Sequence, residues 1–187
     1  MSENNFGYKR LDRTLIHHGA IIDVYQDTMQ IPNGNTAKWD FIGHKGAAAV
    51  VAVRDDGKLV MVKQYRNALE RVTLEIPAGG RDGAEEPFLE CAHRELEEET
   101  GYTCKKEDMQ FLISVYTTVA FCNERIDIFL AEHLTPSRQH LDEDEYLNVV
   151  ACDLDELLEL IYAGKMQDAK TVAAILAYQN LLQQRGR

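Results

Sequence analysis

Residues 80–102 run from a glycine-rich polar loop into a short helix, and this segment constrains the fold more than any other. Pro87 suits the first helical turn, and Gly101 suits the left-handed residue that commonly follows a helix. Strand-like stretches lie on both sides of the helix along the chain. A lone helix between strands must bury one face against a sheet, so the segment predicts helices packed on a sheet.

Three glutamates share one face of this helix. Glu95, Glu98 and Glu99 stand at positions i, i+3 and i+4, so their carboxylates project from neighbouring points. Like charges at this spacing weaken a helix, whereas bound Mg²⁺ or Mn²⁺ would turn the repulsion into a binding site, because hard cations prefer oxygen ligands. An acidic run is more often a solvated helix face, and that alternative stays open for the run taken alone.

Stretches of β-branched and alternating residues predict strands before and after this helix. Asn33-Gly34-Asn35 and Asp55-Asp56-Gly57 suit hairpin turns between the early strands. The predicted strands cover residues 21–31, 37–42, 47–53, 58–65, 73–76, 111–118, 125–131 and 147–152. Pro77-Ala78-Gly79-Gly80 is expected to break the strand pattern before the helix.

Two helices are predicted after the last strand. Asp153, with Glu156 three residues later, has the spacing of a capping box, and Gly164 is expected to end that helix. A final helix begins near Asp168, with apolar residues at helical spacing. The order of elements predicts an α+β fold, an α/β/α sandwich with a mixed sheet between helices.

The composition limits the possible partners. A net charge of -11 argues against binding nucleic acid, and a phosphate substrate would need bound cations to reverse the local field. The cysteines lack paired-motif spacing and no secretion leader opens the chain, which favours reduced thiols and a cytoplasmic location. No apolar stretch approaches the length of a membrane span, so no membrane partner is expected.

The spacing around the glutamates resembles the Nudix box. From Gly80 it matches the pattern Gx5Ex7REUxEExGU over 23 residues. The resemblance implies a metal-dependent hydrolase of pyrophosphate bonds, in which Glu95, Glu98 and Glu99 are metal ligands and Glu99 is also catalytic. The residues that it implies hold the loop and helix in register are Gly80, Glu86, Arg94 and Gly101.

The resemblance also implies a backbone carbonyl ligand just before the box glycine. Counting back from the helix makes that residue Gly79. Counting from Ile76-Pro77-Ala78-Gly79, which resembles the LPAG stretch of many relatives, makes it Ala78. We expect Ala78, because the end of a strand is the more rigid anchor, and Gly79 is the alternative.

Motifs outside the box resemble the ADP-ribose pyrophosphatase branch of the family. They are Gln64-Tyr65-Arg66, Leu74-Glu75-Ile76-Pro77-Ala78-Gly79, Glu124-Arg125-Ile126, Phe129-Leu130-Ala131 and Asp168-Ala169-Lys170-Thr171. The resemblance implies hydrolysis of ADP-ribose or a related nucleoside diphosphate sugar to a nucleoside monophosphate and a sugar phosphate. Arg66 would then bind a phosphate or the terminal ribose, or else be a surface arginine. Trp39 would stack on adenine, or else be a core or interface aromatic.

An acidic run over residues 141–146 occupies the place where this branch has further carboxylates. The resemblance leads us to expect Glu143 as the general base and Glu145 as an additional metal ligand. On an extended segment these two side chains would point the same way, towards the helix glutamates. A solvated acidic loop is the alternative.

The resemblance implies an N-terminal antiparallel β extension over residues 1–45, which exchanges strands in a homodimer, and a Nudix domain over residues 46–187. Residues 116–121 lack two prolines that many relatives have, which weakens the preference for ADP-ribose over UDP-glucose or GDP-mannose. Two other hypotheses are a non-catalytic sensor of nucleotide sugars and a Nudix enzyme for another nucleoside polyphosphate. The complete glutamate set disfavours the sensor, since recognition alone does not need three repelling carboxylates.

Overall fold

A computed structural model describes residues 5–20, 22–143 and 145–186. Ile21, in a predicted strand, and Asp144, in the acidic run, lie outside the described residues. The chain divides into two compact units: Met1–Lys45 with Tyr116–Arg125, and Gly46–Val115 with Ile126–Arg187. The predicted helix of glutamates belongs to the second unit.

The first unit contains a three-stranded antiparallel sheet in the order β1-β2-β3. Its strands are β1 (Lys9–His18), β2 (Asp23–Gln30) and β3 (Thr36–Gly43). Gly34 has a φ of +87° in the turn between β2 and β3, so the predicted hairpin is confirmed. Arg13 binds Asp27 through two hydrogen bonds of 2.6 Å and lies over the ring of Phe41, which ties the three strands together.

The second unit is built on a mixed sheet in the order β12-β5-β4-β10-β9, with β6 paired to β5 and β7 paired to β4. The strands are β4 (Ala47–Val53), β5 (Leu59–Arg66), β6 (Arg71–Glu75), β7 (Ala78–Gly80), β9 (Met109–Tyr116), β10 (Arg125–Ala131) and β12 (Leu147–Cys152). A separate pair joins β8 (Tyr102–Thr103) to β11 (Thr135–Pro136). β4 and β10 run parallel, and every residue of β4 is buried, as expected for a central strand.

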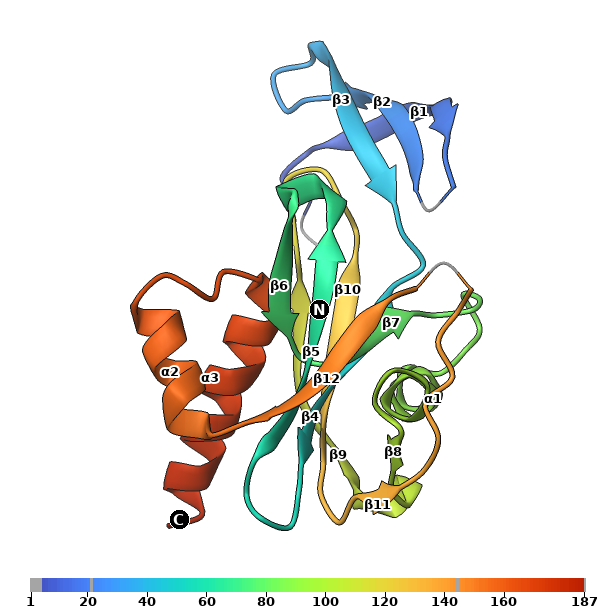
Figure 1. The fold of residues 1–187 in the computed structure, drawn as a ribbon. Helices are drawn as coiled ribbons and strands as arrows, with labels where there is room; N and C mark the ends of the chain where they lie inside the picture. The colour runs from blue at the N-terminus through green and yellow to red at the C-terminus, as the bar shows by residue number, and fades with distance from the viewer. Residues whose placement is uncertain (1–4, 21, 144, 187) are drawn as a thin grey trace. The chain divides into compact units, whose positions relative to one another are not determined.

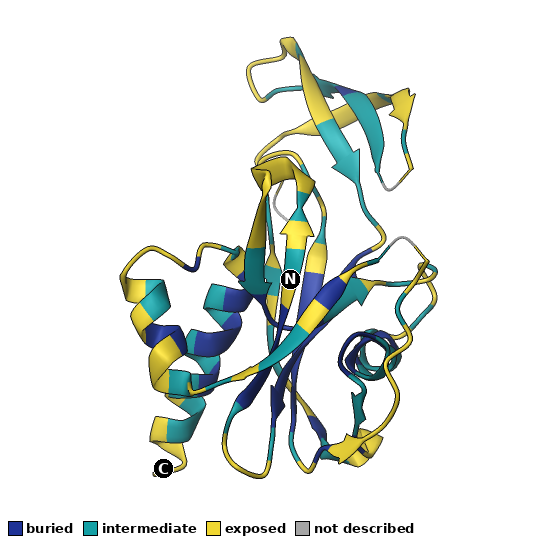
Figure 2. Ribbon diagram, in the orientation of Figure 1, coloured by how far each residue is buried: buried dark blue, intermediate teal, exposed yellow. Residues whose placement is uncertain are grey.

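Helices cover both faces of this sheet (Figure 1). They are α1 (Phe88–Thr100), α2 (Leu154–Tyr162) and α3 (Ala169–Gln184). α2 and α3 pack on one face and α1 on the other, which gives two hydrophobic cores separated by the sheet. Figure 2 shows the buried residues gathered on the central strands and on the helix faces that meet them. The predicted α/β/α sandwich is therefore confirmed.

The ends of the helices and the segment before α1 confirm some of the local predictions and contradict others. Gly101 has a φ of +67° and ends α1, as predicted. The predicted break over residues 77–80 is partly wrong, because residues 78–80 form β7 by pairing with β4. Asp153 does begin α2, but no capping bond forms, because its carboxylate binds the Lys58 ammonium at 2.7 Å instead. No helix in the described part of the chain has the length and hydropathy to cross a bilayer.

Candidate functional site

The three helix glutamates project from α1 towards β7 and the loop before β12. α1 is held on the sheet by Ala92 and Leu96, which are fully buried in the core shared with β4. This packing turns Glu95 and Glu99 inward, so they are only 9% and 2% exposed. Glu98 stands half-exposed beside them. The helical spacing read from the sequence thus places carboxylates at the buried edge of α1.

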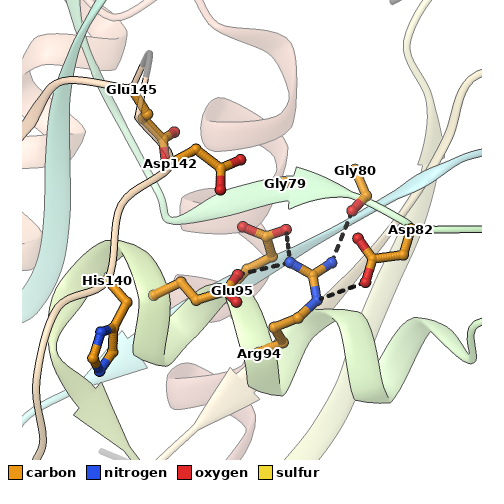
Figure 3. Close-up of a pocket in the computed structure, with 9 residues that line it drawn as sticks. Gly79, Gly80, Asp82, Arg94, Glu95, His140, Asp142 and Glu145 are labelled. Carbon is orange, nitrogen blue, oxygen red and sulfur yellow. Dashed lines mark hydrogen bonds and ion pairs between the residues drawn. The ribbon is translucent and has the colours of Figure 1, made fainter.

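A cavity of about 250 Å³ lies at this edge, between α1, β7 and the loop before β12 (Figure 3). The residues that line it are Gly79, Gly80, Asp82, Arg94, Glu95, Glu98, His140, Asp142 and Glu145. Acidic side chains from the helix and from the loop therefore meet across one space. Such an arrangement repels anions unless cations are bound within it.

Arg94 is the central cation of this site. Its Nη1 donates to Glu95 at 2.6 Å and to Glu98 at 2.7 Å, while Nη2 donates to the Gly80 carbonyl at 2.9 Å. Its Nε donates to Glu86 at 3.3 Å. Burial lowers the pKa of Arg94, but the bonds to Glu86 and Glu98 outweigh it and raise that pKa. One guanidinium thus joins the loop of the box to its helix.

The buried carboxylates resist ionisation. Burial raises the pKa of Glu95 to about 7, although the charge of Arg94 acts in the opposite direction. Burial also raises the pKa of Glu99 to about 8, assisted by the charges of Glu145 and Glu95 and opposed by the bond from the Ala78 amide. Two carboxylates that would repel each other when ionised are therefore held in one low-dielectric place.

The chemistry of this donor set fits a hard divalent cation, because carboxylate oxygens are its preferred ligands. In the described residues no three His, Cys, Asp or Glu side chains form a ready-made cation cluster. The guanidinium of Arg94 instead holds Glu95 and Glu98 together, as the hydrogen bonds above describe. Glu95 and Glu98 are thus among the residues that would hold a metal ion here.

The backbone of β7 approaches the glutamates closely. A side-chain carbon built on Gly79 would overlap the carboxylate of Glu95, so a larger residue there would require that carboxylate to move. The Ala78 amide donates to Glu99 at 2.8 Å, and Gly79 lines the cavity. Both residues proposed for the backbone ligand therefore lie against a helix glutamate, and the choice between them stays a prediction.

The acidic loop is shaped differently from an extended segment. The Glu145 amide donates to the Asp142 carbonyl at 3.1 Å, so the chain turns between them, and both side chains face the cavity (Figure 3). Gln64 of β5 donates to the Glu145 carboxylate at 3.1 Å. Glu143 is exposed within the turn, and its predicted role as the base is untested by this geometry.

Sequence reasoning did not single out three lining residues, Asp82, His140 and Asp142. Asp142 lies in the acidic run, so that run already contained the signal. The His140 amide donates to the Glu98 carbonyl at 2.9 Å, a contact across 42 residues that no local pattern indicates.

The two predicted substrate contacts lie outside this cavity's lining. Arg66 forms a two-bond ion pair with Glu75, with Nε–Oε1 and Nη2–Oε2 distances of 2.8 and 2.6 Å. Trp39 is on β3 of the first unit, 46% exposed, with its ring 5.7 Å from that of Tyr8. The structure therefore gives Arg66 a partner that the sequence did not suggest.

The fold and the box geometry agree with a comparison against family models, in which the NUDIX domain matches residues 43–175. This chain belongs to the Nudix family, so the resemblance seen in the sequence is confirmed, and it is a hydrolase of that class. Hydrolases of this family generally need a divalent metal.

Individual relatives cover nearly the whole chain. It is 43% identical over 169 residues to an ADP-ribose pyrophosphatase of Bacillus subtilis (strain 168), covering 89% of this chain and 90% of the relative. It is 40% identical to a methanol dehydrogenase activator of Bacillus methanolicus, covering 91% of each chain. The crystal structure of an ADP compounds hydrolase, 24% identical, has the same fold, with a TM-score of 0.83 over 96% of each chain.

Proposed function

We propose that this protein hydrolyses the pyrophosphate bond of ADP-ribose, or of a related nucleoside diphosphate sugar, to a nucleoside monophosphate and a sugar phosphate. The observation that carries the proposal is the cavity in which glutamates of α1 and acidic residues of the loop before β12 face one another. The similarity to an ADP-ribose pyrophosphatase over most of both chains supports this choice of substrate.

We propose Glu95, Glu98, Glu99 and Glu145 as ligands of Mg²⁺ or Mn²⁺, together with the carbonyl of Ala78 or Gly79. A bound divalent cation would neutralise the pyrophosphate and lower the pKa of a water molecule for attack on phosphorus. The burial of Glu95 and Glu99 supports this role, because desolvated carboxylates gain most from a nearby cation.

Three further residues would accept the proton or bind the substrate. We propose that Glu143 takes the proton of the attacking water, which requires hydrogen-bond reach in the substrate complex. Arg66 would donate to a phosphate oxygen, since its pair with Glu75 uses only Nε and Nη2. Trp39 would stack on adenine, and its exposure supports a contact with ligand or partner.

We also propose that residues 1–45 form an extension that mediates a homodimer, apart from the Nudix domain of residues 46–187. Leu11, Leu15 and Ile16 of β1 are each at least 48% exposed, which supports a covered surface in the assembled protein. Light scattering of the purified protein tests this, and a monomer at micromolar concentration would contradict it. The four unpaired thiols support the proposed cytoplasmic location.

A substrate panel tests the proposed reaction. Purified protein should be incubated with Mg²⁺ and ADP-ribose, UDP-glucose, GDP-mannose, a dinucleoside polyphosphate or coenzyme A, and the products separated. We expect AMP and ribose 5-phosphate from ADP-ribose. Turnover of the last two compounds alone would shift the proposal to another polyphosphate, and binding without any turnover would favour a sensor.

The 40% identity to a methanol dehydrogenase activator favours one further candidate function, the activation of a dehydrogenase. The test is the rate of a methanol dehydrogenase with and without this protein, with Mg²⁺ present. A Glu99→Gln variant serves as the control that separates activation by hydrolysis from activation by binding.

A further inference from the structure

The start of helix α3 is tied to the end of strand β6 by two neighbouring contacts. Lys170 donates through Nζ to the Glu75 carboxylate, and Thr171 accepts the Ile76 amide at 3.0 Å. Asp168 begins α3, accepting the Thr171 amide at 3.1 Å and lying 3.0 Å from Lys170 Nζ. Residues 168–171, which resemble a motif of the ADP-ribose pyrophosphatase branch, thus bind the end of β6 through Lys170 and Thr171.

Each carboxylate oxygen of Glu75 accepts two hydrogen bonds. Its Oε1 accepts from Arg66 Nε at 2.8 Å and from Thr73 Oγ1 at 2.5 Å. Its Oε2 accepts from Arg66 Nη2 at 2.6 Å and from Lys170 Nζ. The carboxylate is 2% exposed, so four donors fix its plane in a place that water does not reach.

A fixed carboxylate fixes the arginine in turn. The Arg66 guanidinium is planar, and two parallel bonds to Glu75 leave it little freedom to rotate. In the described residues Nη1 of Arg66 has no hydrogen-bond partner, and the side chain is 39% exposed. The guanidinium therefore presents Nη1 outward while Glu75 holds Nε and Nη2.

The held arginine lies close to the acidic site. Gln64, two residues earlier on the same face of β5, donates to Glu145 at 3.1 Å. A pyrophosphate bound at the glutamates would thus have Arg66 at the edge of its binding site.

We propose that Lys170 and Thr171 are positioning residues, which hold Glu75 and its strand so that Arg66 presents Nη1 to a phosphate of the substrate. This inference rests on the proposed function, because it assumes a pyrophosphate in the cavity. In the described part of the chain, the hydrogen bonds of Lys170 go to Glu75 and Asp168 rather than to a proposed metal ligand. It acts by keeping the Glu75 carboxylate aligned with the guanidinium, so that Arg66 is ordered before the substrate arrives.

The first test compares Lys170→Met with Lys165→Met, which removes an exposed lysine of the same unit. The measurements are kcat and KM for ADP-ribose, and the Kd of a methylene-bridged ADP-ribose analogue that cannot be hydrolysed, by calorimetry. We expect Lys170→Met to raise KM and Kd roughly tenfold, the size of one charged hydrogen bond, with kcat changed less than about threefold. Lys165→Met should change none of these values.

A double-mutant cycle separates positioning from general loosening of the fold. In an Arg66→Lys background the fork is absent, so adding Lys170→Met should raise Kd by less than about twofold. An equal rise in both backgrounds would overturn the inference, as would an unchanged Kd in Lys170→Met alone. Should Lys170→Met not fold, Thr171→Val, which keeps the side-chain shape, replaces it in the same cycle.

The analogue also distinguishes the inference from the proposed function. Wild-type protein that binds the analogue but hydrolyses no nucleotide sugar would contradict the proposed reaction, while the Kd values would still decide the role of Lys170. Wild-type protein that binds no analogue would overturn both.

Discussion

Replacing Glu75 with glutamine removes a buried charge that two cations share. Burial alone would raise the pKa of Glu75, but the bonds from Arg66 and the charge of Lys170 lower it from 4.5 to about 2. At about 1.36 kcal/mol per unit of pKa, this fall corresponds to about 3 kcal/mol of folding free energy at neutral pH. We therefore expect Glu75→Gln to reduce the free energy of unfolding by about 3 kcal/mol at pH 7.

The same reasoning gives the direction of the pH dependence. Because the folded state lowers the pKa of Glu75, the stabilisation is complete above 4.5, the pKa in the unfolded chain. It is lost as the pH falls towards 2, where the folded carboxyl also binds a proton. At pH 3.5 about 1.4 kcal/mol of the difference between wild type and Glu75→Gln should be gone.

Urea unfolding at pH 7 and pH 3.5 measures both values, followed by circular dichroism. Other carboxyl groups titrate in this range, but they contribute equally to wild type and variant, so the difference isolates Glu75. Glu159→Gln on the exposed face of α2 is the matched control, and it should stay within about 0.5 kcal/mol of wild type. A difference below about 1 kcal/mol at pH 7, or one that widens at pH 3.5, would refute the reasoning.

Three further predictions concern the glutamates of α1 and the β7 backbone that lies against them. Glu99→Gln should lower turnover roughly a thousandfold, since metal-assisted steps are worth several kcal/mol. Without metal, the variant should melt no lower than wild type. A near-normal kcat would remove Glu99 from the site. The raised pKa values of Glu95 and Glu99 mean that the folded state binds protons more tightly than the unfolded state. The melting temperature of metal-free protein should therefore fall from pH 5 to pH 8, and Mg²⁺ should reverse the fall. Calorimetric scans with EDTA or Mg²⁺ test this, and a flat profile would contradict it. Gly79→Ala should lower activity and cost about 1 kcal/mol of stability, because its new carbon forces the Glu95 carboxylate to move. Gly80→Ala, with open space around it, should stay active, and equal kinetics for the two variants would count against the close approach.

Local patterns predicted much of this fold because they act over a few residues. The bounds of β4, β10 and β12 follow from short apolar runs, and the end of α1 follows from Gly101. The helix spacing also placed Glu95 and Glu98 on one cavity. These features depend on side-chain periodicity, which is written directly in the sequence.

Contacts between distant segments could not be predicted in the same way. β7 looks like a break because of its glycines, and only pairing with β4 makes it a strand. Arg66 looked like a surface arginine or a phosphate ligand, since nothing near it in sequence marks Glu75 as its partner. The turn between Asp142 and Glu145 likewise depends on a backbone bond rather than on an alternating pattern.

The pairing of Lys170 with Glu75 joins residues that are 95 positions apart, and this separation has a consequence for protein synthesis. At about 5 to 20 residues per second, Glu75 is joined to the chain about 5 to 20 seconds before Lys170. During that interval the β6 carboxylate lacks one of its two cations, so its burial is less favourable. The rate of synthesis along residues 76–170 therefore sets how long each new chain contains Glu75 without Lys170.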